Sequence, residues 1–202
     1  FYLLLNGSGV GRDYSSESCR VDWEYMPNVR LVLDGGDDDS GSPEKGAHPD
    51  FNSASIEFIS CFDSVKEARH KYDSESEDVR WITVRDSREG WAEVIAVLET
   101  AAFHRNHKDS LFIFDFSEVR PKGSPIKGMQ NRSAQGPLPL MRAIAKVLTI
   151  KGVKMKPWKQ ALFIDHYLAA CVVMGNVRRA ARMSTKWWKD RDVIEFIDVK
   201  RG

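Results

Sequence analysis

Several groups of residues in this sequence have types and spacings that could bind phosphate. Near the start, Gly7-Ser8-Gly9-Val10-Gly11 could let a backbone approach a phosphate closely. Its spacing is not that of a dinucleotide fingerprint, and no Gly-Lys-Ser/Thr follows it. Taken alone, these glycines are therefore better explained as a tight turn that serves the fold.

A second group is basic and aromatic. Arg178, Arg179 and Arg182 are followed by Lys-Trp-Trp-Lys at residues 186–189. Such a cluster is typical of surfaces that hold single-stranded nucleic acid. However, 30 basic and 29 acidic side chains give a net charge of +1, which argues against a polynucleotide partner. A small phosphorylated ligand needs only one or two arginines, whose planar guanidinium can grip a phosphate.

Two further pairs of titratable residues have structural explanations. Asp165 and His166 lie within a predicted apolar helix, and no second ligand follows at metal spacing, which favours a hydrogen-bonded histidine. Asp86 and Glu89 have the spacing of a helix capping box. We therefore predict neither a catalytic residue nor a metal site from these pairs.

The length and composition of the chain limit the class of protein to which it can belong. With 202 residues, of which 42% are hydrophobic and 29% charged, the chain can bury the core of one domain or of one domain with an insertion. Cys19, Cys61 and Cys171 are odd in number and form no Cys-x-x-Cys pair, so a reducing cytoplasm fits best. Residues 161–174 are too few for a membrane span, and no leader is recognisable. We expect a cytoplasmic protein without membrane partners.

The second half of the chain has an α/β pattern. We predict a strand over residues 81–84, a helix over 86–104 and a strand buried on both faces over 111–116. The Gly- and Pro-rich loop 120–137 is too long for a simple connector. Helices over 138–148 and from Pro157 to about Met174, ended by Gly175, should follow. A basic loop, a short strand and a helix capped by Asp190 complete the chain.

The first half is less regular. Residues 1–5 predict a buried strand, and a polar stretch with strand-like runs at 30–34 and 56–61 extends to about Glu77. Because a Gly-, Asp- and Ser-rich loop interrupts it, we interpret this stretch as an insertion. Apolar elements reach both ends of the sequence, which indicates a chain cut from a longer one.

Four segments, taken together and in order, resemble the monomeric type of class II, adenosylcobalamin-dependent ribonucleotide reductase. They are residues 6–11, 86–91, 114–127 and 175–181, and residues 192–197 followed by Lys200 resemble a later family segment. No single motif is specific, but their order and joint presence are. The resemblance is densest from Trp81 to the end and thin over residues 13–77.

The resemblance implies a fold and a set of site residues. The fold would be α/β, part of the first half of a ten-stranded ribonucleotide-reductase-like barrel with a polar insertion. Residues 1–12 would be a barrel strand and glycine turn, 13–80 an effector-region insertion, and 81–202 a barrel segment with two nucleotide-sensing loops. A deoxynucleoside triphosphate effector would meet Asp86, Ser87, Arg120 and Lys127. The substrate-base loop would contain Val173, Gly175, Asn176, Val177 and Arg178, and the turn of Gly7, Ser8, Gly9 and Gly11 would lie beside the substrate.

The resemblance also implies what this chain lacks. The family reduces a ribonucleoside triphosphate by a radical that adenosylcobalamin initiates, with a radical cysteine, a reducing cysteine pair and a glutamate base. None of the three cysteines here lies in a matching motif. We therefore expect effector and substrate-base recognition, no assignable cobalamin contact, and no turnover without the remaining reductase segments. Residues 128–137 are longer and more polar than the family's Gly-Gly-x-Ala-Ser-Gly-Pro loop, which leaves the effector contacts open.

Two alternatives remain open. A stand-alone regulatory protein derived from the reductase would bind deoxynucleotides without any partner. A single-stranded nucleic-acid-binding module would instead bind with a steep salt dependence and ignore free nucleotides.

Overall fold

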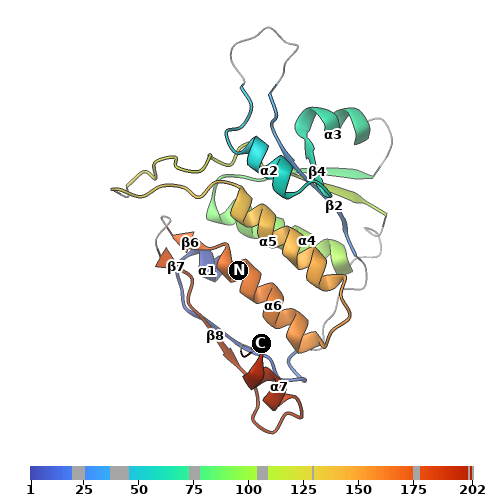
Figure 1. The fold of residues 1–202 in the computed structure, drawn as a ribbon, viewed down its shortest axis with the longest axis vertical. Coiled ribbons are helices and arrows are strands. Elements are labelled where there is room, and N and C mark those ends of the chain that lie inside the picture. The colour runs from blue at the N-terminus through green and yellow to red at the C-terminus, as the bar shows by residue number, and fades with distance from the viewer. Residues whose placement is uncertain are drawn as a thin grey trace.

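A four-stranded parallel sheet with helices around it is the largest unit of the fold (Figure 1). The computed structural model describes residues 1–19, 26–36, 46–72, 78–103, 109–128, 130–174, 178–199 and 201. Parallel strands need crossover connections, and helices supply them here. The strand order is β3 (Phe62–Ser64), β2 (Asn28–Leu33), β5 (Leu111–Asp115) and β4 (Val79–Thr83), and the intervening helices are α2 (Phe51–Glu57), α3 (Val65–Tyr72) and α4 (Arg88–Phe103).

The central strands bury alternate residues in two different cores. Leu33 and Phe114 belong to the main core, which the sheet shares with α4 and α5 (Leu138–Lys151). Val32 and Ile113 point to the other face and join a smaller core with Ala68 of α3. All five residues of β5 are buried, which confirms the prediction of a strand covered on both faces.

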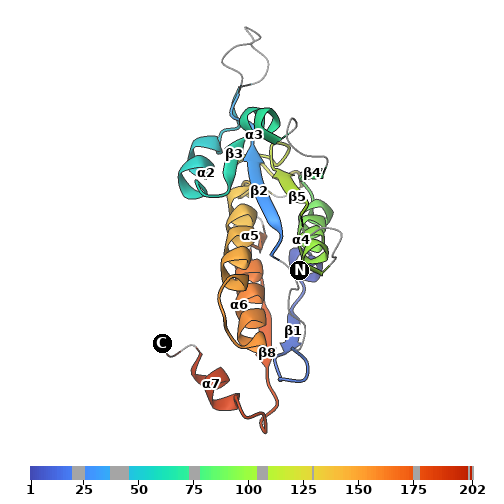
Figure 2. The same ribbon diagram turned by 90° about the vertical axis from the view of Figure 1, so that its right-hand side faces the viewer.

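A second unit joins the two ends of the chain. The strand β1 (Val10–Asp13) pairs in parallel with β8 (Arg182–Thr185), beside the helix α6 (Pro157–Ala170). Asp165 of α6 accepts hydrogen bonds from Tyr14 Oη (2.6 Å) and Arg12 Nη1 (2.8 Å). In the part of the chain that the structure describes, the hydrogen bonds of the Asp165-His166 pair are made by the aspartate, and His166 is exposed. Figure 2 shows an elongated molecule, with the four-stranded sheet toward one end and α7 (Val193–Asp198) toward the other.

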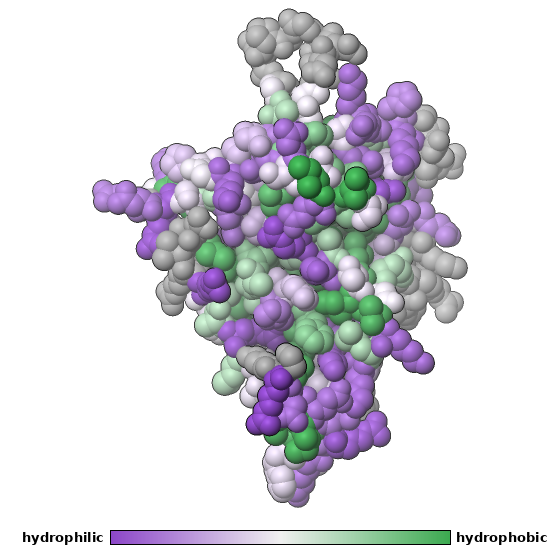
Figure 3. All heavy atoms as spheres, viewed as in Figure 1, coloured by the Kyte–Doolittle hydropathy of each residue, from purple (hydrophilic) through white to green (hydrophobic). Residues whose placement is uncertain are grey.

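Several predictions of secondary structure are wrong, and the N-cap of α7 is Asp192 and not the predicted Asp190. Residues 1–5 are not a strand but contain the short helix α1 (Tyr2–Leu5). The run 56–61 lies at the end of α2 and in the turn after it, where Ile56 and Ile59 are 81% and 84% exposed. Exposed apolar residues also occur elsewhere, because the face of the molecule in Figure 3 carries apolar residues scattered among polar ones. The helix α6 ends at Ala170 because the next residues form β6 (Val173–Met174), which pairs with β7 (Arg178–Arg179).

The division of the chain predicted at residue 80 stays a prediction. Residue 80 lies inside β4, and the sheet combines strands from both sides of it. The strands β2, β3, β4 and β5 therefore form one sheet, whereas β1 and β8 belong to another.

A buried ion pair fastens residues 14–16 to the segment after β8. Lys186 Nζ lies 3.2 Å from Asp190 Oδ2, and the two side chains are 0% and 5% exposed. Lys186 also donates to Tyr14 O (2.8 Å), and Asp190 accepts from the Ser16 backbone nitrogen (2.7 Å). This network joins segments from opposite ends of the chain.

Acid should loosen this connection. The hydrogen bonds from the backbone nitrogens of Ser16 and Asp192 lower the pKa of Asp190. A carboxyl group with a lowered pKa stabilises the fold above its ordinary titration range, and the stabilisation is lost as the pH falls through the lowered value. We expect the melting temperature to fall more between about pH 5 and about pH 2 in the wild type than in Asp190→Asn, whose amide does not titrate. Equal falls in both proteins, measured by circular dichroism, would contradict this role.

Candidate functional site

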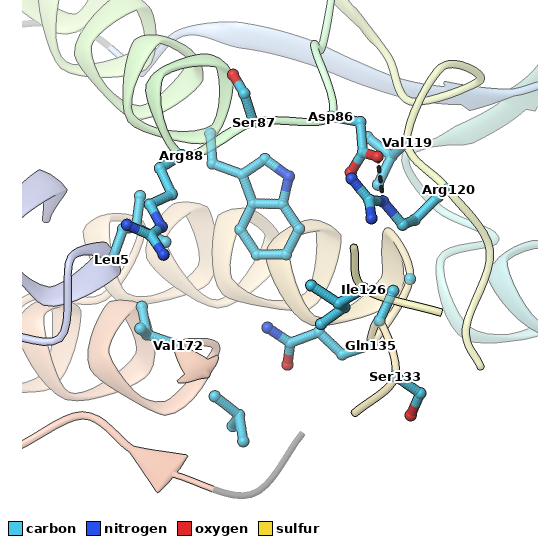
Figure 4. A pocket seen from close by; sticks show the side chains of 14 residues that line it. Leu5, Asp86, Ser87, Arg88, Val119, Arg120, Ile126, Ser133, Gln135 and Val172 are labelled. Atoms are coloured by element: carbon cyan, nitrogen blue, oxygen red, sulfur yellow. Dashed lines mark hydrogen bonds and ion pairs between the residues drawn. The ribbon is translucent and has the colours of Figure 1, made fainter. Parts of the chain in front are cut away.

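A pocket lies outside the carboxyl ends of the neighbouring parallel strands β4 and β5 (Figure 4). Ligands of open α/β sheets bind at such edges, beyond the carboxyl ends of the strands. The pocket has a volume of about 220 Å³. It is lined by Leu5, Asp86, Ser87, Arg88, Trp91, Val119, Arg120, Ile126, Ser133, Ala134, Gln135, Gly136, Val172 and Val173.

Two of the predicted effector residues form an ion pair in this pocket. Arg120 Nε donates to Asp86 Oδ2, as the dashed line in Figure 4 marks, and the two side chains are 40% and 31% exposed. Within the described part of the chain, the hydrogen bond of Arg120 uses Nε, so its two Nη groups can still donate to an anion. Asp86 therefore holds the guanidinium without blocking it.

The third predicted effector residue, Ser87, caps α4. Its Oγ accepts from Gly90 N (3.0 Å) and its carbonyl from Trp91 N (3.1 Å). The N-cap predicted at Asp86 is thus one residue too early, because the Asp86 carboxylate pairs with Arg120 instead. The start of a helix favours anions through its free N–H groups and its dipole, and here it opens beside the pocket.

The first helix fixes the position of this helix start. Tyr2 Oη donates to Glu89 Oε1 (3.2 Å), and Arg88 Nη1 donates to Asn6 Oδ1 (3.1 Å). Arg88 thereby adds a second guanidinium to the pocket wall. Glu89, predicted as half of a capping box with Asp86, contacts α1 instead.

Residues 120–128 and 130–136 form an arm that extends from the body of the molecule (Figure 1). Ladder-like hydrogen bonds hold its two sides together, for example Ala134 N to Ser124 O (2.7 Å) and Gly123 N to Ala134 O (2.9 Å). Ile126 lines the pocket, whereas the neighbouring Lys127 is exposed and does not. The structure thus brings Asp86, Ser87 and Arg120 together but not Lys127, whose effector role stays a prediction.

The arm is connected to the start of the predicted substrate-base loop. Gln135 Nε2 donates to Cys171 O (3.0 Å), and Val172 and Val173 follow at the pocket wall. Gly175, Asn176 and Val177 lie outside the described residues. Arg178 is described for its backbone, which pairs with Met174. One hydrogen bond therefore joins the first loop to the segment that leads into the second.

The glycine turn lies near the pocket without lining it. Gly7 has a φ of 76°, and its backbone nitrogen donates to Leu4 O (2.9 Å), which closes the turn after α1. Ser8 and Gly9 lead into β1, and Gly11 lies within that strand. The positive φ at Gly7 supports a structural role for this residue, and the substrate-adjacent role of the turn stays a prediction.

Gly136, by contrast, is required by its surroundings. Its φ is +75°, and a Cβ would lie 2.5 Å from Asp50 Oδ2 and 2.9 Å from Lys122 N. We expect Gly136→Ala to lower the free energy of unfolding by about 2 kcal/mol in urea denaturation. Gly123→Ala is the matched control, because its φ of +91° is similar but nothing lies within 4 Å of the place that its Cβ would take. A cost at Gly136 no larger than at Gly123 would contradict the close approach.

Burial disfavours the thiolate form of the three cysteines, which is the form that reacts in thiol–disulfide exchange. Burial raises the pKa of Cys19 and Cys61, and it raises the pKa of Cys171 to about 12. Over the ranges that the structure describes, no cluster of three or more His, Cys, Asp or Glu side chains could hold a metal ion. Nor do the described helices include one of the length and apolar character needed to cross a membrane.

The sequence matches known reductases over most of its length. A family model described as the insertion domain of B12-dependent ribonucleotide reductase matches residues 52–151. A Mycobacterium phage D29 protein that carries the name of a putative adenosylcobalamin-dependent ribonucleoside-triphosphate reductase is 29% identical over 217 residues, covering 100% of this chain and 28% of that protein. The adenosylcobalamin-dependent ribonucleoside-triphosphate reductase of Levilactobacillus brevis is 30% identical over 197 residues, covering 91% of this chain and 23% of its own length.

A solved structure shares the fold. The crystal structure of a B12-dependent, class II ribonucleotide reductase aligns with a TM-score of 0.73 at 21% identity, over 99% of this chain and 26% of that one. The mixed α/β fold with parallel sheets is therefore the fold of part of such an enzyme. The chain spans about a quarter of the length of the curated relatives it matches. On these matches, the chain belongs to the adenosylcobalamin-dependent, class II ribonucleotide reductase family.

Proposed function

We propose that this chain supplies the effector-recognition and substrate-base-recognition part of a ribonucleoside-triphosphate reductase. The observation that carries the proposal is the pocket in which Asp86, Ser87 and Arg120 meet. In this proposal a deoxynucleoside triphosphate is the effector, and a ribonucleoside triphosphate is the substrate of the complete enzyme. The two-stranded sheet of β1 and β8 then belongs to the ten-stranded barrel of that enzyme.

The chemistry of the pocket suits a nucleotide. Arg88, Arg120 and the start of α4 offer positive charge and N–H donors to phosphate oxygens. Trp91, which is 8% exposed, and Ile126 give the same pocket an apolar part against which a base could pack. A polyphosphate and an aromatic base on one ligand would satisfy both parts.

The hydrogen bond from Gln135 to Cys171 gives this recognition a route to the substrate. An effector that moves the arm changes this bond, and Val172 and Val173 follow directly in the chain. Two connected loops of this kind can adopt more than one arrangement. They can respond to each effector base if the effector binds these arrangements with different affinities. The proposed role of the second loop rests on this connection.

Adenosylcobalamin, on which the named relatives depend, supplies a radical for the reaction of the complete enzyme. The described residues do not fit that centre, because the radical must pass to a cysteine, and the three cysteines here lie outside the family's cysteine motifs, with Cys19 and Cys171 buried in the cores. The radical chemistry is therefore assigned to the remaining reductase segments. The purified chain should form no deoxynucleotide with adenosylcobalamin and a dithiol, and turnover would contradict this assignment.

A thermal-shift panel tests the proposal directly. A ligand that binds the native state at a hundred times its Kd stabilises it by about 2.7 kcal/mol, which is a shift of several degrees. We expect at least one of dATP, dGTP, dCTP and dTTP to raise the melting temperature, and no shift with any of them would overturn the proposal. A stand-alone regulator would show the same shifts and no change on addition of the remaining reductase segments. A nucleic-acid module would respond to an oligonucleotide, with steep salt dependence, and not to these ligands.

A further inference from the structure

We infer that His48 and Asp50 are positioning residues of the pocket, which together hold the backbone on both sides of Arg120. The inference rests on the proposed function, because it assigns these residues a part in effector binding. Neither residue lines the pocket, and both come from the segment that precedes α2.

The segment of residues 46–50 is itself anchored to the sheet. His48 N donates to Asp34 O (2.8 Å), directly after β2, and His48 O accepts from Phe51 N (2.9 Å). The His48 side chain is buried, with 8% of the residue exposed. A buried polar ring must find hydrogen-bond partners, and the partners it finds define its role.

The first clamp is the hydrogen bond from His48 to Val119. The Nδ1 atom accepts from Asp50 N (3.1 Å), so the ring is the neutral tautomer with its proton on Nε2. This Nε2 group donates to Val119 O at 2.8 Å. Val119 lines the pocket and directly precedes Arg120. The hydrogen bond from the ring therefore fixes the carbonyl group of the peptide bond that joins Val119 to Arg120.

The second clamp is the Asp50 carboxylate. Its Oδ2 accepts from Lys122 N (2.9 Å), on the other side of Arg120. The same oxygen lies 2.5 Å from the place of a Cβ on Gly136, at the base of the returning side of the arm. Asp50 therefore contacts both ends of the arm, and only a glycine lets the arm come this close.

The two clamps act on the position of a charged group. Arg120 is held at its side chain by Asp86 and at its backbone neighbours by His48 and Asp50. Loss of a clamp would let the Arg120 backbone shift, and hydrogen bonds to phosphate depend steeply on geometry. The main core does not need these bonds, since it is formed by apolar residues of the sheet, α4 and α5.

Variants that keep or lose single hydrogen bonds test the inference. In His48→Gln the amide nitrogen can still donate to Val119 O, whereas His48→Asn is too short to reach it and His48→Ala loses both bonds. In Asp50→Asn the amide oxygen can still accept from Lys122 N, whereas Asp50→Ala cannot. We expect the Kd for the best-binding of the four deoxynucleoside triphosphates to stay near the wild-type value in His48→Gln and Asp50→Asn, and to rise about tenfold in His48→Asn, His48→Ala and Asp50→Ala.

Calorimetric titration of the folded proteins, with melting temperatures measured alongside, separates the outcomes. A Kd near the wild-type value in His48→Gln and Asp50→Asn supports the positioning role. A general loss of stability would not depend on whether one particular hydrogen bond is kept. Unchanged Kd values in His48→Asn and Asp50→Ala would overturn the inference while leaving the proposed function intact. Kd values that follow melting temperature and not hydrogen bonding would overturn it too. Failure of the wild type to bind any of the four nucleotides would instead overturn the proposed function. If His48→Ala does not fold, the comparison of Asp50→Asn with Asp50→Ala decides.

Discussion

Phe114→Ala is expected to lower the free energy of unfolding by about 4 kcal/mol, a larger loss than Gly136→Ala should cause. Phe114 is 0% exposed and belongs to the main core, where β5 meets α4 and α5. Its removal loses the transfer free energy of a phenyl group and leaves a cavity that a sheet covered on both faces cannot close. Urea denaturation with a two-state fit gives the measurement.

Two controls define what this loss means. Ile113→Ala, on the same strand, empties the smaller core instead and should cost less, about 3 kcal/mol. Ile59→Ala removes an apolar side chain that is 84% exposed, and we expect almost no change. A loss at Phe114 no greater than at Ile59 would contradict the arrangement of the cores. Because β5 leads directly to Val119 and Arg120, Phe114→Ala should also weaken nucleotide binding.

The elements that the sequence predicted well are long or strongly patterned. The helix that begins near Ser87 has an apolar face with helical periodicity, and the continuous run of β5 is short and rich in aromatic residues, which favours a buried strand. Residues 1–5 and 56–61 are short apolar runs, which suit a strand or a helix turn equally, and tertiary contacts decide between them. Tyr2 contacts Glu89 of α4, which favours a helix there.

The candidate site was predicted residue by residue only where a family resemblance existed. Asp86, Ser87 and Arg120 came from the resemblance, but their meeting depends on the pairing of β4 with β5, which no local pattern encodes. His48 and Gln135 were missed for the same reason, since their partners Val119 and Cys171 lie far away in the sequence. The one local indication was the Gly- and Pro-rich composition of residues 120–137, which include Gly136 but do not reveal its closeness to Asp50.

Arg120→Ala should weaken deoxynucleoside triphosphate binding about 100-fold, because charge-assisted hydrogen bonds to phosphate are lost with the guanidinium. Arg142→Ala is the matched control, since it removes the same charge from a pair with Glu57 on the surface of α5 and should leave Kd within about threefold.

The double-mutant cycle with Asp86→Ala decides how the ion pair acts in this pocket. If Asp86 works by orienting Arg120, Asp86→Ala alone should weaken binding about tenfold, and adding it to Arg120→Ala should change little more. The factors would multiply to about 1,000-fold if Asp86 contacted the effector independently of Arg120. The direct hydrogen bond from Arg120 Nε to Asp86 favours the first result, and fully multiplicative losses in calorimetric Kd values would contradict it. Because the two side chains are 40% and 31% exposed, water screens their pairing, and the coupling should come from geometry more than from the energy of the ion pair itself.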